Sequence, residues 1–287
     1  MPSTPPVTEA PAGTSASAGV STPDGSNGSK GPAESAGSGT ASGFAMPAAF
    51  RYVLTPLALC VVLAGLAWHV RGQRLDLIEE RSLNADYLIS RTVQHLELTA
   101  LATVFILIVA IPCGVLLTRR WARPVAGPIL ALASIGQALP SLGIIVLLAV
   151  AFVSLGVTQI AMIAFVVYGV LPVLRNTIAG LQQVDESVIE SARGMGMTRG
   201  AVLWRIELPL ATPVMLAGIR TALVITVGTV ALATFIGAGG LGDVISNGIN
   251  SSRNLVLVTG SVLVAVLALL IDWLAGIAED FLRPRGL

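Results

Sequence analysis

The chain has 287 residues, of which 54% are hydrophobic and only 11% are charged, and its net charge at neutral pH is +1. A soluble domain normally carries about 25% charged residues, so this composition excludes an ordinary soluble protein and favours a membrane protein. The near-zero net charge also argues against a polyanion-binding tail, and nucleic acid is not an expected partner.

The first part of the chain, residues 1–45, is rich in Ser, Gly, Ala, Pro and Thr and has almost no large apolar side chains. Such a segment cannot bury enough surface to offset its ordering entropy, so we predict a disordered tail. The segment lacks a basic start followed by an apolar core, and a signal peptide is therefore not expected.

Six apolar stretches follow the tail, and a helix needs about 20 residues to cross the hydrocarbon core. They are predicted as membrane spans at 52–70, 96–118, 126–153, 158–174, 214–236 and 255–278. The segment 71–95 is expected to lie outside the membrane. The fourth stretch is the least regular, because Tyr168, Gly169 and Pro172 interrupt it. The predicted fold class is an all-α membrane protein with about six transmembrane helices.

Three prolines, Pro112, Pro140 and Pro172, lie inside predicted spans. A proline removes one backbone hydrogen bond and is tolerated where neighbouring groups satisfy the freed carbonyl. Kinks of this kind either border a pathway or serve helix packing, and the sequence alone does not decide between these roles.

The polar loop between the fourth and fifth spans, residues 184–210, has more internal pattern than a simple connector needs. Ser187 and Glu190 have capping-box spacing, and Asp185 is a competing N-cap residue. A short helix is therefore expected, and Gly194 and Gly196 are expected to end it with a sharp reversal.

A second short helix is predicted at 201–206, with Pro209 ending it before the fifth span. The result is a helical hairpin with an apolar face and no core of its own. Such a face needs a partner protein, or else the hairpin lies on the lipid headgroups as an amphipathic element.

The spacing of the loop resembles that of the permease subunits of ABC importers. It is carried by Glu190-Ser191-Ala192, Gly196, Ile206 and Leu208-Pro209, with Ser191 in place of the usual second-position alanine. The resemblance implies a type I importer permease fold whose loop is a cytoplasmic coupling helix. Glu190, Ser191, Ala192 and Gly196 would form the contact turn, and Ile206, Leu208 and Pro209 would anchor the loop to its own membrane helices.

The resemblance covers about residues 95–280 and extends to the subgroup that imports osmoprotectants. The stretches that carry it are 137–143, 168–177, 193–197 and 236–242. They imply import of a quaternary amine such as glycine betaine, choline or carnitine. A permease for another solute, of the amino acid or methionine type, is the alternative. An ion-coupled secondary transporter is disfavoured, because neither internal repeats nor buried coupling charges are evident.

The chain has no GxxxxGK[ST] sequence, so it is not expected to hydrolyse ATP itself. The resemblance implies two ATP-binding partner subunits that use ATP and Mg, a second permease copy or sister permease, and an extracytoplasmic substrate-binding protein. It also implies the bacterial cytoplasmic membrane. The distribution of arginines around the spans then favours cytoplasmic termini.

Polar residues within or beside the spans are candidates for the translocation path: Gln137, Ser141, Tyr168, Asn176 and Thr229. Each is equally suited to an interhelical hydrogen bond. Quaternary amines are normally held by aromatic cages, and no cage is evident in a chain with 5% aromatic residues. Selectivity is therefore assigned to the separate binding protein.

The remaining polar residues predict no catalytic or metal site. Asp272 is interpreted as an interfacial carboxylate paired with Arg220, and His69 and His95 as solvated or capping residues beside the outer segment. The segment 237–242 is expected to form a tight turn or a short re-entrant entry to the pathway. Cys60 and Cys113 are interpreted as small buried hydrophobic residues.

Overall fold

The computed structural model describes residues 48–282, and every regular element in that range is a helix, as the all-α prediction requires. The disordered tail predicted at 1–45 lies outside the described residues. The elements are α1 (Ala48–Arg71), α2 (Leu77–Ser82), α3 (Ala85–Leu117), α4 (Arg123–Ala138), α5 (Ser141–Ala151), α6 (Val157–Gln182), α7 (Glu186–Gly194), α8 (Arg199–Val202), η1 (Leu203–Glu207), α9 (Leu208–Leu232), η2 (Ala233–Ile236), α10 (Gly242–Asn250) and α11 (Asn254–Leu282).

Five stretches of the described chain are long and apolar enough to cross a membrane as single helices. They are 52–71 in α1, α3, α6, the continuous stretch 199–236 that contains α9, and α11. The pair α4 and α5 makes a sixth if it is counted as one broken span. The fourth predicted span, which looked irregular in sequence, is the uninterrupted helix α6 and runs through Pro172.

The third predicted span, 126–153, is wrong as a single helix. Helix α4 ends at Ala138, α5 begins at Ser141, and the two helix axes differ by 97°. Pro140 has no N–H to continue the helix, and it forces the preceding Leu139 into an extended conformation with φ −71° and ψ 147°. The break therefore follows from one proline and the restriction that it imposes on its neighbour.

The outer segment predicted at 71–95 contains the start of a long helix. Helix α3 begins at Ala85, where the side chain of the N-cap residue Asn84 accepts a hydrogen bond from Asp86 N–H at 2.8 Å. The polar residues 85–95 thus form the first turns of this helix. His95 is fully buried in this helix, not solvated or capping as the sequence suggested.

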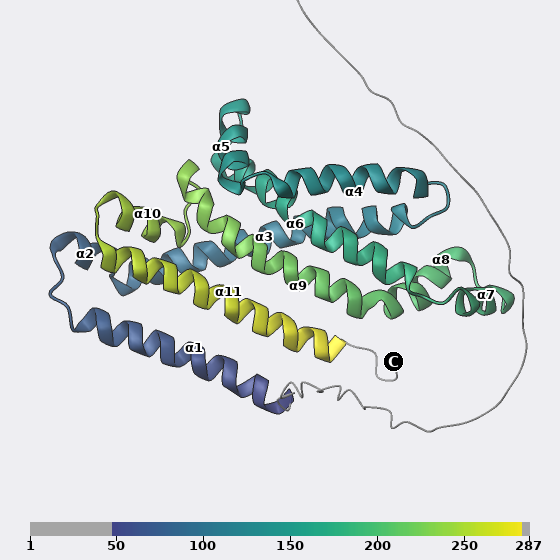
Figure 1. Cartoon of the computed structure of the whole chain (residues 1–287), viewed down its shortest axis with the longest axis horizontal. Coiled ribbons are helices and arrows are strands. Elements are labelled where there is room, and N and C mark those ends of the chain that lie inside the picture. The colour runs from purple at the N-terminus through teal and green to yellow at the C-terminus, as the bar shows by residue number, and fades with distance from the viewer. Residues whose placement is uncertain (1–47, 283–287) are drawn as a thin grey trace, which may run out of the picture. The chain divides into compact units, whose positions relative to one another are not determined.

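Helix α6 is the centre of the bundle and packs mainly against α9 and α3, while α4 and α5 cover another part of it. Helix α11 packs against α9 and α10, and α1 packs against α11. Figure 1 shows α2 and α10 at one end of the long helices and α7 and α8 at the other. We call these the glycine end, for the turn 237–242 near α10, and the hairpin end.

Two glycines let the central helices approach closely. A Cβ on Gly169 of α6 would lie 2.1 Å from Ile106 Cδ1 of α3, and a Cβ on Gly218 of α9 would lie 2.8 Å from Pro172 O of α6. Small residues of this kind allow close backbone contact where lipid provides no hydrophobic driving force between helices. The three helices therefore form a tightly packed unit between the two ends.

Candidate functional site

The hairpin begins at α7, whose N-cap is Asp185 rather than Ser187. The Asp185 carboxylate accepts a hydrogen bond from Ser187 N–H at 2.9 Å, and this bond lowers the pKa of the carboxyl. The cap therefore holds above the unfolded-state pKa and is lost as the pH falls through the lowered value. Helix α7 ends at Gly194, and Gly196 reverses the chain with φ +87°.

The second half of the hairpin differs from the expected helix at 201–206. Helix α8 covers Arg199–Val202, and a π-helical turn, η1, continues it without a loop into α9. Pro209 does not end a helix, because it lies in the first turn of α9, where its missing N–H is tolerated. The bond from Leu208 N–H to Leu203 O widens the turn just before it.

A buried ion pair ties this continuous element to the bundle. Arg119, just after α3, donates from Nη2 to Glu207 Oε2 at 2.7 Å and from Nη1 to Oε1 at 3.4 Å. The Glu207 side chain is only 10% exposed and that of Arg119 is 31% exposed. Glu207 was not among the residues predicted to have a function. It could have been noticed, because it is a lone carboxylate between two apolar residues beside a predicted span.

The residues that resemble the importer contact turn do not all face outward. Glu190, Ser191 and Gly196 are exposed, whereas Ala192 is 1% exposed. The small size of Ala192 thus serves packing within the chain and does not present a surface to a partner. A Cβ on Gly196 would meet no atom within 4 Å, so the reversal itself is open to its surroundings.

The residues expected to anchor the hairpin lie at the start of α9. Leu208 is partly buried and packs against the cluster of Leu181, Ala211 and Met215, which joins α6 to α9. Ile206 is half-buried and Pro209 is exposed. Among the three, Leu208 makes the contact with the membrane helices that an anchoring residue needs.

Large apolar side chains are exposed on the hairpin. Val188 is 41% exposed, Met195 is 77% exposed and Trp204 is 73% exposed. Exposed apolar side chains on a polar element are candidates for contact with a partner.

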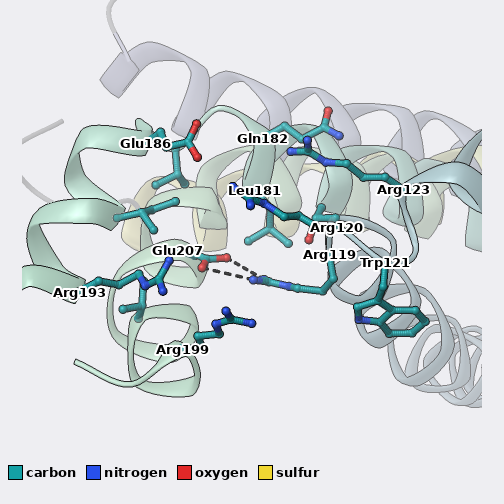
Figure 2. A pocket seen from close by; sticks show the side chains of 14 residues that line it. Arg119, Arg120, Trp121, Arg123, Leu181, Gln182, Glu186, Arg193, Arg199 and Glu207 are labelled. Atoms are coloured by element: carbon teal, nitrogen blue, oxygen red, sulfur yellow. Dashed lines mark hydrogen bonds and ion pairs between the residues drawn. The ribbon is translucent and has the colours of Figure 1, made fainter. Parts of the chain in front are cut away.

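A cavity of about 600 Å³ lies between the hairpin and the turn that joins α3 to α4. Figure 2 shows arginines entering it from opposite sides, three from residues 119–123 and two from the hairpin. Its charged lining residues are Arg119, Arg120, Arg123, Arg193, Arg199, Glu186 and Glu207. The excess of arginine gives the cavity a formal charge of +3.

Two of the candidate path residues join the α4–α5 break to α6. Gln137 Nε2 donates to Tyr168 O at 3.1 Å, and the Tyr168 hydroxyl donates to Leu139 O. Tyr168 O is the carbonyl that Pro172, four residues later, leaves without a helical donor. Gln137 therefore satisfies the carbonyl that Pro172 leaves free, and Tyr168 satisfies a carbonyl at the break before Pro140.

The other candidates make local bonds. Asn176 Nδ2 donates to Pro172 O at 2.9 Å, and Thr229 Oγ1 bonds to Ile225 O and Thr226 O within α9. Ser141 is the first residue of α5, beside the break. The structure brings together Gln137, Ser141 and Tyr168, whereas Asn176 and Thr229 lie elsewhere on α6 and α9.

At the glycine end, the turn 237–242 is held by side chains of α3. Gln94 Oε1 accepts from Gly240 N–H at 3.0 Å, and His95 Nδ1 accepts from Leu241 N–H at 3.2 Å. His95 Nε2 lies 3.1 Å from Val227 O of α9, so this nitrogen carries the hydrogen of a neutral ring. Arg91 adds an ion pair to Asp243 at 3.0 Å.

The predicted pairing of Asp272 with Arg220 is confirmed. Arg220 Nε and Nη2 lie 2.5 and 2.6 Å from the two Asp272 oxygens, and the pair joins α9 to α11. Within residues 48–282, no group of three or more His, Cys, Asp or Glu side chains is arranged to hold a metal ion.

The fold and the site define a multi-pass membrane protein in which helix α9 is continuous with a polar helical hairpin at one end of the bundle. Residues 110–284 match the family described as the binding-protein-dependent transport system inner membrane component. The chain belongs to this family of importer permease subunits, and the resemblance seen in the sequence is confirmed.

Curated relatives have names that specify osmoprotectant uptake. The chain is 39% identical over 210 residues to the carnitine transport permease protein OpuCD of Listeria monocytogenes, covering 73% of this chain and 92% of the relative. It is 40% identical over 215 residues to the choline transport system permease protein OpuBB of Bacillus subtilis, covering 74% and 95%. It is 38% identical to the osmoprotectant import permease protein OsmW of Salmonella typhimurium, covering 74% and 100%.

Solved importer structures have the same fold. The inward-facing MetNI methionine ABC transporter includes a chain with a TM-score of 0.59 and 26% identity, covering 69% of this chain and 97% of that chain. A chain of an amino acid ABC transporter with histidines has a TM-score of 0.60 at 18% identity and covers 73% and 100%, which supports the fold alone.

Proposed function

We propose that this permease forms the membrane pathway of an ATP-driven importer for a quaternary amine such as glycine betaine, choline or carnitine. The identity of 38–40% to permeases named for carnitine, choline and osmoprotectants carries the choice of solute. A solute of the amino acid or methionine type is the second candidate, since a methionine transporter has the same fold.

The hairpin is the coupling element in this proposal. Its exposed turn, with Glu190, Ser191 and Gly196, and its apolar side chains Val188 and Met195 would contact an ATP-binding subunit. That subunit would use ATP and Mg, and two copies would serve a pair of permeases, with this chain beside a second copy or a sister permease.

The route of coupling follows from the continuity of η1 and α9. Because no loop separates them, a displacement of the hairpin moves the start of α9, which packs along α6. The Arg119–Glu207 pair and the contacts of Leu208 keep the same point attached to α3 and α6. The force is therefore delivered to the central helices and is not absorbed in a flexible linker.

The hairpin end is cytoplasmic in this proposal, in a bacterial cytoplasmic membrane. Arginines at that end outnumber those at the glycine end, which agrees with the rule that basic residues face the cytoplasm. With six crossings both termini lie inside. A binding protein outside would deliver the solute to the glycine end and provide the selectivity, so the pathway itself can release its cargo.

The test is uptake by vesicles that contain the permease, its ATP-binding subunit and the binding protein. Labelled glycine betaine, choline and carnitine are compared with labelled methionine, with and without vanadate. We expect vanadate-sensitive uptake of a quaternary amine. Uptake of methionine alone would refute the proposal that the solute is a quaternary amine. Uptake without nucleotide hydrolysis would refute the importer mechanism in favour of a secondary transporter.

A further inference from the structure

We propose that the arginine-lined cavity at the hairpin end binds the phosphate of an anionic phospholipid headgroup. Five arginine side chains line this cavity of about 600 Å³. Glu207 neutralises one of them, Arg119, through two hydrogen bonds. The other four have no hydrogen-bond or ion-pair partner among residues 48–282: Arg120, Arg123, Arg193 and Arg199.

All four of these arginines are exposed, and together they give the lining of the cavity an uncompensated positive charge that attracts an anion. Figure 2 shows Arg120 and Arg123 approaching from the α3–α4 turn and Arg193 and Arg199 approaching from the hairpin. A guanidinium group presents a planar set of donors that matches phosphate oxygens and forms paired hydrogen bonds. The remaining carboxylate in the lining, Glu186, is exposed and offsets only one of the four charges.

The position of the cavity favours a lipid as the source of the phosphate. Its wall at 118–123 joins two membrane helices, and Trp121 in that wall is 75% exposed, as expected for an aromatic ring at headgroup level. Leu116 of α3 and Val125 of α4 lie on either side of the turn and are each 48% exposed. These apolar surfaces would lie against the acyl chains of a lipid whose headgroup enters the cavity.

The bound headgroup would have a mechanical consequence. Its phosphate would contact arginines of the bundle and arginines of the hairpin together, and would add to the Arg119–Glu207 ion pair between them. Anionic lipid would therefore fix the position of the hairpin, whichever solute the permease carries. Lipid binding needs neither ATPase nor substrate, so a failure of this inference is separate from a failure of the proposed function.

The experiment is titration of the purified chain in detergent with phosphatidylglycerol and, separately, with phosphatidylcholine, with bound lipid counted by native mass spectrometry. The test variant R120Q/R193Q removes one unpaired arginine from each side of the cavity. The matched control R71Q/R74Q removes two exposed arginines from the opposite end. A charge near the headgroups contributes about fivefold to anionic lipid binding, so we expect about twenty-five-fold weaker binding of phosphatidylglycerol in the test variant.

Further outcomes decide the source of the anion. Equal retention of phosphatidylglycerol by the test and control variants would overturn the proposal. Inorganic phosphate that displaces the lipid at equal concentration would identify a free-anion site instead. Unchanged lipid retention with lost binding of the ATP-binding subunit would assign the arginines to an acidic protein surface. If R120Q/R193Q does not fold, R120K/R193K keeps the charge but loses the planar donors, and weaker retention is still expected.

Discussion

Two glycine turns lie at opposite ends of the bundle and have the same left-handed backbone, with φ +87° at Gly196 and φ +82° at Gly240. Their surroundings differ. A Cβ on Gly196 would meet nothing within 4 Å, whereas a Cβ on Gly240 would lie 3.1 Å from His95 Nδ1. The neighbouring Gly239 is closer still, with Gln94 Nε2 at 2.3 Å from its added Cβ.

A glycine with left-handed backbone therefore serves two structural purposes in this chain. At the hairpin end, glycine gives a reversal whose backbone stays exposed, as a docking element requires. At the glycine end, it allows the chain to lie directly on α3, where Gln94 and His95 bond to its N–H groups. The first turn is open, as the proposed contact with an ATP-binding subunit requires, and the second is fixed by contacts within the chain. The following variants test that distinction.

The largest effect on stability is expected from His95→Ala, beside the turn 237–242 at the glycine end. It removes a fully buried ring and leaves Leu241 N–H and Val227 O without their partner. A lost buried hydrogen bond and the remaining cavity together cost about 3–5 kcal/mol. Thermal unfolding in detergent should show a large loss of stability.

Two further variants check the cause. His69→Ala, at an exposed position, should leave the unfolding temperature unchanged. His95→Asn should recover part of the loss, because its side-chain oxygen replaces Nδ1 as an acceptor for Leu241 N–H but does not reach Val227 O. An unaltered melting curve for His95→Ala would contradict the conclusion that His95 fixes the turn 237–242.

Glu207→Gln should have the next largest effect, because it weakens the connection between the hairpin and α3. The neutral amide still reaches Arg119 but leaves its charge uncompensated in a partly buried place, at a cost of about 1–2 kcal/mol after allowance for the exposure of Arg119. The expected result is weaker stimulation of the ATP-binding subunit by substrate. Glu186→Gln, in the same cavity but exposed, is the control and should behave as wild type.

Gly196→Asp tests the open turn and should barely affect the fold. Left-handed backbone costs a non-glycine residue about 1 kcal/mol, and a Cβ at this position meets no atom within 4 Å. Membrane insertion and melting should therefore be normal, while the changed contact turn uncouples ATP hydrolysis from transport. Gly194→Asp, at an equally open position without positive φ, is the control. Normal substrate-stimulated ATPase activity in Gly196→Asp would refute the docking role of the turn.

The sequence predicted the features that depend on local pattern. Apolar length predicted where the long helices lie, except for the break at Pro140, and the spacing of Asp185, Gly194 and Gly196 located α7 and its reversal. The pairing of Arg220 with Asp272 was also predicted, because two opposite charges near one membrane boundary have few other partners. Each of these features depends either on residues that are close in sequence or on the free-energy cost of leaving a charge unpaired near the membrane.

The missed features depend on contacts between distant segments. Burial of His95 depends on a turn that comes 146 residues later, and burial of Glu207 depends on Arg119, which is 88 residues earlier. Pro112 and Pro172 lie within continuous helices, whereas Pro140 ends one. Proline alone does not distinguish these cases, because the outcome depends on what satisfies the carbonyl that it frees.

The smallest effect is expected from Gln137→Leu, which separates packing from hydrogen bonding at the α4–α5 break. The leucine fills similar space but leaves Tyr168 O without the donor that replaces the missing N–H of Pro172. Hydrogen bonds between membrane helices contribute about 0.6 kcal/mol on average, so melting should shift only slightly. Asn176→Leu removes a bond within α6 and should not alter the break. If uptake falls much more in Gln137→Leu than stability does, Gln137 acts in the pathway itself. The α4–α5 break would then have a role in transport, whereas the turn 237–242 has a role in stability.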